Sequence, residues 1–195
     1  MTRIYDTRTA LIVVDVQNDF ADPAGSLAVA GGEDVVGVAN AEIAAAVAAG
    51  APVLYTQDWH PADTPHFAKD GGTWPVHCVQ GTWGAQLHHD LDVRGEVVRK
   101  GENGEDGYSG FTMRDPVSGS TVPTPLARLL RERGVERLVV LGLATDYCVR
   151  ATALEGRQLG WPVVVPWEGV RAVDLQPGDG ERTRKELLAA GVEIA

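Results

Sequence analysis

Six short apolar runs recur along the chain and constrain its fold more than any other feature. They occupy residues 11–15, 52–58, 96–100, 137–143, 162–166 and 192–195. Most of them are rich in valine, leucine and isoleucine on both sides of the chain, which predicts strands buried on both faces. Such strands are typical of parallel sheets, because the crossovers that join parallel strands place helices over each face.

Helical patterns lie between these runs. Residues 33–50 begin with an acidic turn, residues 125–134 begin with a proline, and residues 181–191 form a third pattern; all three end at a glycine. Acid or proline at the start and glycine at the end are the expected signals of helix termini. Strands that alternate with helices predict βαβ units, and we expect residues 1–195 to form one α/β domain.

Composition excludes several classes of partner. Seventeen basic and 27 acidic side chains give a net charge of −10, which disfavours binding to nucleic acid or to an anionic membrane. No apolar run approaches the roughly 18 residues of a membrane span, and the first residues lack the apolar stretch of a secretory signal. Two cysteines are too few for a disulfide framework, so we expect a reducing, cytoplasmic location.

Cys148 lies in GLATDYCVRATAL, where the run 137–143 gives way to a helical pattern. We expect Thr145 or Asp146 to cap a helix that continues to about Leu159, which places Cys148 in its first turn. Free backbone N–H groups and the helix dipole favour a thiolate there, and the same N–H groups can hold an oxyanion. The alternative is a small buried thiol without chemistry.

Two charged residues end other predicted strands. Asp15 ends LIVVD and Lys100 ends EVVRK. The carboxyl ends of parallel strands meet at the edge where open α/β sheets carry their ligands, so we expect both side chains near Cys148. The alternatives are that Asp15 caps a turn and that Lys100 is a solvated charge.

A carboxylate and three imidazoles follow the run 52–58. Asp58 and His60 are two residues apart and point to the same side of an extended chain; His66 and His77 follow in the same loop. This set of nitrogen and oxygen ligands suits Zn²⁺, Fe²⁺ or Mn²⁺. The alternative is a loop with solvated histidines.

For the two other histidines and the other cysteine we predict neither a catalytic nor a metal-binding role. We expect His88 and His89 to face solvent from a helix formed by GAQLHHDL. Cys78 adjoins His77, but neighbouring residues of an extended segment point in opposite directions, so we expect a packed thiol there.

Four motifs resemble those of one enzyme family. They are VDVQNDF, DWH…H…WPVHCVQGTWGAQL, KG…YSGF and GLATDYCVRATAL, in that order over about residues 10–170. The set is similar to that of the nicotinamidases among the isochorismatase-like cysteine hydrolases. The resemblance implies a six-stranded, mostly parallel sheet with helices on both faces. It also implies hydrolysis of nicotinamide to nicotinate and ammonia in NAD salvage, and often of pyrazinamide.

The resemblance further implies roles for individual residues. The implied catalytic triad is Asp15, Lys100 and Cys148. The implied oxyanion hole consists of the backbone N–H groups of Ala144 and Cys148, in a turn with a cis peptide at residues 143–145. One divalent metal ion, with Zn²⁺ preferred over Fe²⁺ or Mn²⁺, is implied at Asp58, His60, His77 and, in some members, His66. The implied aromatic walls of the substrate pocket are Phe20, Trp74 and Tyr108.

Other functions stay open on the sequence. The same fold can hydrolyse another small amide or ureido compound, although the relatives that cleave N-carbamoyl compounds generally lack the D-x-H…H set. A non-catalytic metal-binding module predicts that a member of the triad is replaced, and a dinucleotide-binding domain requires a G-x-G-x-x-G that LIVVDVQNDF does not supply. We expect a small-molecule substrate, and the sequence is compatible with a homo-oligomer.

Overall fold

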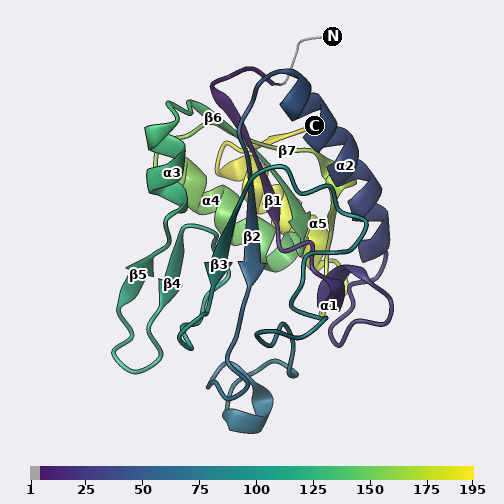
Figure 1. Ribbon diagram of the computed structural model, residues 1–195, viewed down its shortest axis with the longest axis vertical. Helices are drawn as coiled ribbons and strands as arrows, with labels where there is room; N and C mark the ends of the chain where they lie inside the picture. Colours follow the sequence, from purple (N-terminus) through teal and green to yellow (C-terminus); the bar gives the residue numbers. More distant parts are fainter. Residues whose placement is uncertain (1–4) are drawn as a thin grey trace.

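The computed structural model describes residues 5–195, which pack around one parallel sheet (Figure 1). The main strands run in the order β3-β2-β1-β6-β7-β9, and every neighbouring pair is parallel. Their bounds are β1 (Thr9–Val14), β2 (Val53–Asp58), β3 (Glu96–Lys100), β6 (Arg137–Leu143), β7 (Val163–Val165) and β9 (Glu193–Ile194). A two-residue strand, β8 (Val170–Arg171), also pairs with β6. The predicted six-stranded parallel sheet is confirmed, with β8 as an addition.

Helices cover both faces of this sheet, as Figure 1 shows. The helices are α1 (Asn18–Ala21), α2 (Gly32–Ala48), α3 (Leu126–Glu132), α4 (Arg150–Gln158) and α5 (Asp179–Ala189). Helix α2 packs on one face, and α3, α4 and α5 lie on the other. In α2 the buried side chains of Val35, Ala39, Ile43 and Ala46 recur every three or four residues, which is the spacing that turns one stripe of a helix towards a core.

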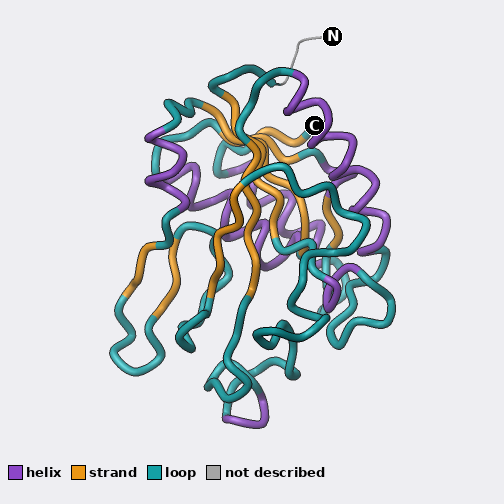
Figure 2. Tube along the Cα trace, viewed as in Figure 1, coloured by secondary structure: helices purple, strands orange, loops and turns teal. Residues whose placement is uncertain are grey.

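Two segments differ from the prediction. Residues 101–124, which hold none of the predicted strands or helices, contain the antiparallel hairpin β4 (Thr112–Arg114) and β5 (Thr121–Pro123), which projects beside the sheet (Figure 2). The helix expected at GAQLHHDL is absent from residues 84–91, and this prediction is wrong. The backbone there pairs with the chain after β1 instead: Asn18 N–H donates to Gln86, and His88 N–H donates to Val16.

The segments that follow the carboxyl ends of β1, β2, β3 and β6 gather at one edge of the sheet (Figures 1 and 2). This edge is where ligands bind in open α/β sheets, and it holds the candidate site. Within the described part of the chain, no helix combines the length and the apolar character that a bilayer crossing demands.

Candidate active site

Cys148 lies in a π-helical turn between β6 and α4. The turn is η2 (Thr145–Val149), and the Val149 N–H donates to the carbonyl of Ala144, five residues earlier, over 3.1 Å. The sequence predicted an ordinary first α-helical turn at this point. The Leu143–Ala144 peptide is cis, which the family resemblance implied. Single π-helical turns inside helices are frequent at functional sites.

The predicted helix cap is wrong. Ala144 occupies the N-cap position, and no side chain caps the turn. The Asp146 carboxylate instead accepts hydrogen bonds from the backbone N–H groups of Val173 and Asp174, each over 2.9 Å. Asp146 therefore holds the segment that follows β8 beside the turn that carries Cys148.

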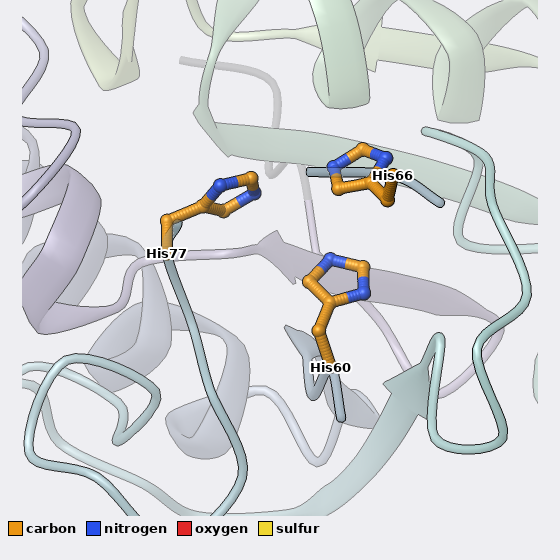
Figure 3. Close-up of side chains that lie close together, drawn as sticks. All are labelled: His60, His66 and His77. Atoms are coloured by element: carbon orange, nitrogen blue, oxygen red, sulfur yellow. The ribbon is translucent and has the colours of Figure 1, made fainter. Parts of the chain in front are cut away.

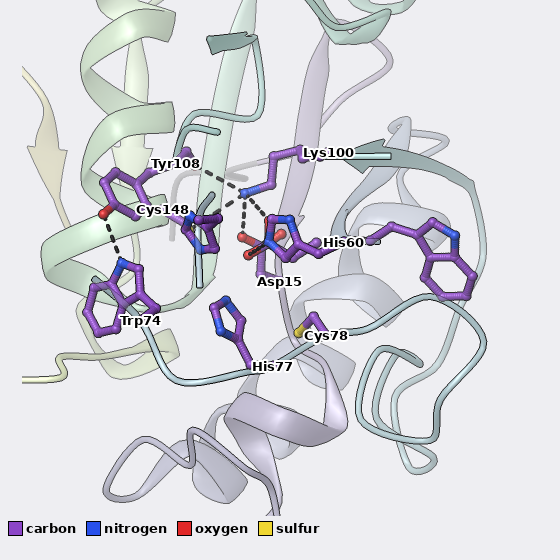
Figure 4. Close-up of polar contacts among 12 residues, drawn as sticks. Asp15, His60, Trp74, His77, Cys78, Lys100, Tyr108 and Cys148 are labelled. Atoms are coloured by element: carbon purple, nitrogen blue, oxygen red, sulfur yellow. Dashed lines mark hydrogen bonds and ion pairs between the residues drawn. The ribbon is translucent and has the colours of Figure 1, made fainter. Parts of the chain in front are cut away.

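Asp15 directly follows β1 and is fully buried. Its backbone has a φ of 49°, in the left-handed region. The Thr56 hydroxyl donates to one carboxylate oxygen over 2.6 Å, and the Lys100 ammonium donates to the other over 2.8 Å (Figure 4). Both oxygens of Asp15 are therefore held in place by neighbours on β2 and β3.

Lys100 connects the charged groups of the site. Its Nζ also lies 2.9 Å from Oδ1 of Asp58, 3.6 Å from Sγ of Cys148 and 3.3 Å from the carbonyl oxygen of Tyr108. The side chain is only 1% exposed. The structure thus brings Asp15, Lys100 and Cys148 together, and it adds Asp58 to the same cluster.

Burial and charge set the protonation of this cluster. Burial raises the pKa of Cys148 well above its ordinary range, although Lys100 opposes this. Burial also raises the pKa of Asp15, again against the effect of Lys100. Burial opposes the charge on Lys100, but the carboxylates of Asp15 and Asp58 outweigh it and raise the pKa of the lysine. At neutral pH the thiol is therefore protonated, and the lysine carries the positive charge.

Three buried histidines form a second cluster (Figure 3). His60, His66 and His77 each offer a ring nitrogen within 4.8 Å of the other two. The Nδ1 of His77 lies 2.7 Å from the carbonyl oxygen of Pro75, which can only accept, so Nδ1 carries the proton and Nε2 keeps a free lone pair. Burial lowers the pKa of His77 to about 4, which keeps the ring in the neutral form that binds metals.

His60 provides the test of whether a metal ion fits. Among residues 5–195 neither of its ring nitrogens has a hydrogen-bond partner, although the side chain is buried. Buried polar groups are normally paired, so the His60 ring requires a partner that is not part of the chain. Asp58 adds a carboxylate, with Oδ2 3.8 Å from Nε2 of His60. Three imidazoles and one carboxylate fit a divalent cation.

A second group of similar residues does not fit a metal. Asp22, His88 and His89 also lie close together. However, the Asp90 N–H donates to Nδ1 of His88 over 3.2 Å, so a neutral His88 ring carries its proton on Nε2 and has no free lone pair there. His88 is also buried, which corrects the prediction that it faces solvent, whereas His89 is exposed as expected.

An aromatic pocket opens above Cys148 and encloses about 420 Å³ including its mouth. The three predicted wall residues, Phe20, Trp74 and Tyr108, all line it. The indole N–H of Trp74 donates to the Tyr108 hydroxyl over 3.0 Å, which ties two walls together (Figure 4).

The sequence analysis missed several residues of the pocket and its surroundings. The unpredicted lining residues are Leu27, Val29, Leu143, Tyr147 and Val173. Tyr147 contacts Trp74 edge-on, with ring centroids 4.9 Å apart. Its position next to Cys148 was the one available signal; Leu27, Val29 and Val173 lie in loops without periodicity. Asp106, which contacts His66, was also missed.

A buried thiol, carboxylate and ammonium group at the carboxyl edge of a parallel α/β sheet define a class of cysteine-dependent hydrolases. Residues 9–189 match the Isochorismatase domain, and the chain belongs to this family. The nicotinamidase of Escherichia coli is 40% identical over 95% of this chain and 93% of its own length. Ureidoacrylate amidohydrolases also match, at 32–36% identity and over less of both chains.

Solved structures give the same picture. A pyrazinamidase of Pyrococcus horikoshii in complex with zinc superposes with a TM-score of 0.85 at 38% identity, covering 96% of this chain and 98% of its own. A protein of L. infantum in complex with nicotinate has a TM-score of 0.85 at 40% identity, covering 97% and 92%.

Proposed function

We propose that this chain is a nicotinamidase that hydrolyses nicotinamide to nicotinate and ammonia, a step of NAD salvage, and that it also accepts pyrazinamide. The observation that carries the proposal is the position of the Cys148 thiol, beside Asp15 and Lys100 and at the base of an aromatic pocket. Similarity to the E. coli nicotinamidase and to a nicotinate-bound structure supports it.

The pocket lining favours a neutral aromatic amide over a ureido acid. Among residues 5–195, no arginine or lysine lines the pocket. Lys100 lies behind Cys148 and is already paired with the carboxylates of Asp15 and Asp58. A ureidoacrylate carries a carboxylate, and the described side chains that line the pocket include no lysine or arginine to pair with it. Nicotinamide has a flat ring and no charge, so aromatic walls suit it.

In the first half of the proposed reaction, Asp15 acts as the general base. The carboxylate accepts the proton of the Cys148 thiol while Sγ bonds to the carboxamide carbon, so the net charge of the buried cluster does not change. Lys100 stays protonated and keeps Asp15 in place. The backbone N–H groups of Ala144 and Cys148 stabilise the oxygen that becomes negative. Ala144 at the N-cap and Cys148 within the π-helical turn are close in sequence, which supports this assignment.

In the second half, Asp15 returns the proton to the amide nitrogen, the C–N bond breaks and ammonia leaves. A thioester between Cys148 and the nicotinoyl group remains. Asp15 then accepts a proton from water as the water oxygen attacks the thioester carbon. The proton passes to Sγ as the C–S bond breaks, which restores the thiol. One difficult displacement is thereby divided into two easier ones.

We further propose that Asp58, His60, His66 and His77 hold one divalent cation. Zn²⁺ is favoured by the zinc complex of the Pyrococcus horikoshii relative, with Fe²⁺ or Mn²⁺ as alternatives. When bound, the ion orients the ring nitrogen of the substrate, directly or through water. Positioning of this kind places the carboxamide against Cys148 without a role in bond breaking.

The two thiols bear on the compartment. Cys78 and Cys148 are both free. Because the proposed nucleophile must stay reduced, we propose a cytoplasmic location, where thiols are kept reduced.

The test is ammonia release from nicotinamide by the Zn²⁺-loaded protein, with Cys148→Ala and Cys78→Ala in parallel. Cys78 is the matched control because it is the other free, buried cysteine. We expect Cys148→Ala to lose activity by at least about a thousandfold, with unchanged metal content, and Cys78→Ala to remain active. Activity in Cys148→Ala would show that Cys148 is not the nucleophile. If the wild type releases no ammonia, the proposal that nicotinamide is the substrate is refuted.

A further inference from the structure

We propose that Asp106 is a positioning residue for the metal centre, which holds His66 so that its Nε2 faces the ion. The inference rests on the metal ligands proposed above. The Nδ1 of His66 lies 2.7 Å from Oδ1 of Asp106. An ionised carboxylate can only accept a hydrogen bond, so Nδ1 carries the proton and Nε2 keeps the lone pair that a metal requires.

His66 differs from the other two imidazoles in its partner. Nδ1 of His77 is bonded to a backbone carbonyl, and within residues 5–195 His60 has no partner at either nitrogen. Of the three imidazoles, His66 is the one whose Nδ1 contacts a carboxylate. A carboxylate on the far nitrogen fixes the tautomer and the ring orientation of a metal-binding histidine and makes it a stronger base. Asp106 is therefore placed to strengthen this ligand.

Asp106 is itself anchored by its surroundings. Its backbone pairs with that of Arg114 on β4: the Asp106 N–H donates to the Arg114 carbonyl over 2.8 Å, and the Arg114 N–H donates back. The Gly107 N–H donates to Oδ1 of Asp106 over 2.8 Å, and the Arg114 guanidinium lies 3.6 Å from Oδ2. The hairpin β4–β5 thus supplies a fixed support for the carboxylate that contacts His66.

The same segment joins the two clusters of the site. It begins at Lys100 and reaches Tyr108, whose carbonyl accepts a hydrogen bond from the lysine ammonium. The Tyr108 hydroxyl accepts one from Trp74 at the pocket wall. Asp106 lies between Lys100 and Tyr108 in this segment. The loop that contacts the lysine therefore also contacts a proposed metal ligand.

The experiment measures Zn²⁺ affinity of metal-stripped protein by competition with a chromogenic chelator, without substrate. The variants are Asp106→Asn and Asp106→Ala. The matched control is Glu105→Gln, because Glu105 is the neighbouring acid of the same loop and its carboxylate accepts only from Asn103 among the described residues. We expect the Asp106 variants to bind Zn²⁺ about 10- to 100-fold more weakly, and Glu105→Gln to stay within about twofold of the wild type.

A double-variant cycle separates positioning from loss of charge. In a His66→Gln background, Asp106→Asn should change the Zn²⁺ dissociation constant no further, because the carboxylate acts through the imidazole. Equal affinities of Asp106→Asn and Glu105→Gln, or an undiminished effect without His66, would overturn the proposal.

The outcome is distinguishable from failure of the proposed function. Zn²⁺ affinity is read without nicotinamide, so a protein that binds Zn²⁺ in the expected order but releases no ammonia would refute the substrate and support the role of Asp106. A wild type that binds none of Zn²⁺, Fe²⁺ and Mn²⁺ in the same assay would overturn the metal centre and, with it, this inference.

Discussion

Replacing Lys100 with methionine should destabilise the fold more than neutralising either carboxylate that it contacts. The lysine is 1% exposed, and its Nζ lies 2.8 Å from Asp15 and 2.9 Å from Asp58. Removing one partner of a buried ion pair costs about 3–5 kcal/mol, because the other charge is left buried and unpaired. Here one substitution leaves two carboxylates without their cation, so we expect the upper end of that range, or roughly a 10–20 °C fall in Tm.

Two further variants test whether the unpaired carboxylates cause this loss of stability. Asp15→Asn leaves a balanced pair of Lys100 and Asp58, and asparagine tolerates the left-handed backbone that Asp15 adopts, so its cost should be clearly smaller. In the double variant Asp15→Asn with Lys100→Met, only one carboxylate remains unpaired. The double variant should therefore be more stable than Lys100→Met alone.

Urea unfolding of metal-free protein in the presence of a chelator measures these differences directly. Lys69→Met is the matched control, because Lys69 also lies between two carboxylates, 2.7 Å from Asp63 and 2.6 Å from Asp70, but its side chain is 41% exposed. Solvent screening makes that loss small. The reasoning is refuted if Lys100→Met costs no more than Asp15→Asn, or if the double variant is the least stable of the set.

Two further predictions follow from the backbone and from the thiol. Gly101→Ala should weaken Zn²⁺ binding in the chelator competition, because a Cβ at this position would lie 2.5 Å from Nδ1 of His60. Gly104 is the control, since it has a similarly positive φ but no contact with His60. Gly104→Ala should therefore lower stability but leave the Zn²⁺ affinity unchanged. Burial raises the pKa of Cys148, so its thiol should stay protonated up to about pH 9. The measurement is the ultraviolet thiolate absorbance of the metal-free wild type minus that of Cys148→Ala, followed as the pH is raised. A step in this difference near neutral pH would contradict transfer of the thiol proton to Asp15.

The parts of the fold that could be predicted are those in which local pattern and tertiary packing agree. All six residues of β1 are buried, and the five that follow Thr9 are apolar. Because parallel strands end at one edge, knowing that Asp15, Lys100 and Cys148 lie at or shortly after the carboxyl ends of three of them was enough to place them together. Their distances were not predictable, because β2 lies between β1 and β3 and supplies Thr56 and Asp58 to the cluster.

The parts that could not be predicted depend on partners distant in the sequence. GAQLHHDL has no helix because its backbone pairs with the segment after β1. Asp146 is a good capping residue by type, but its carboxylate is used by residues 173 and 174. Asp106 lies in an acidic, glycine-rich loop, where nothing local distinguishes it from Glu105. In each case a local preference is overridden by a contact that only the folded chain creates.

Asp58 belongs to both halves of the site, and this determines which substitutions can separate them. One of its oxygens lies 2.9 Å from Nζ of Lys100, and the other lies 3.8 Å from Nε2 of His60. The Gln17 side chain holds its backbone from both sides: it accepts from the Asp58 N–H and donates to the Asp58 carbonyl, each over 2.8 Å. Any change at Asp58 or Gln17 therefore disturbs the lysine and the metal ligands together. Asp106 contacts His66 and not the lysine, so its variants can alter the metal centre while the thiol, Asp15 and Lys100 keep their arrangement.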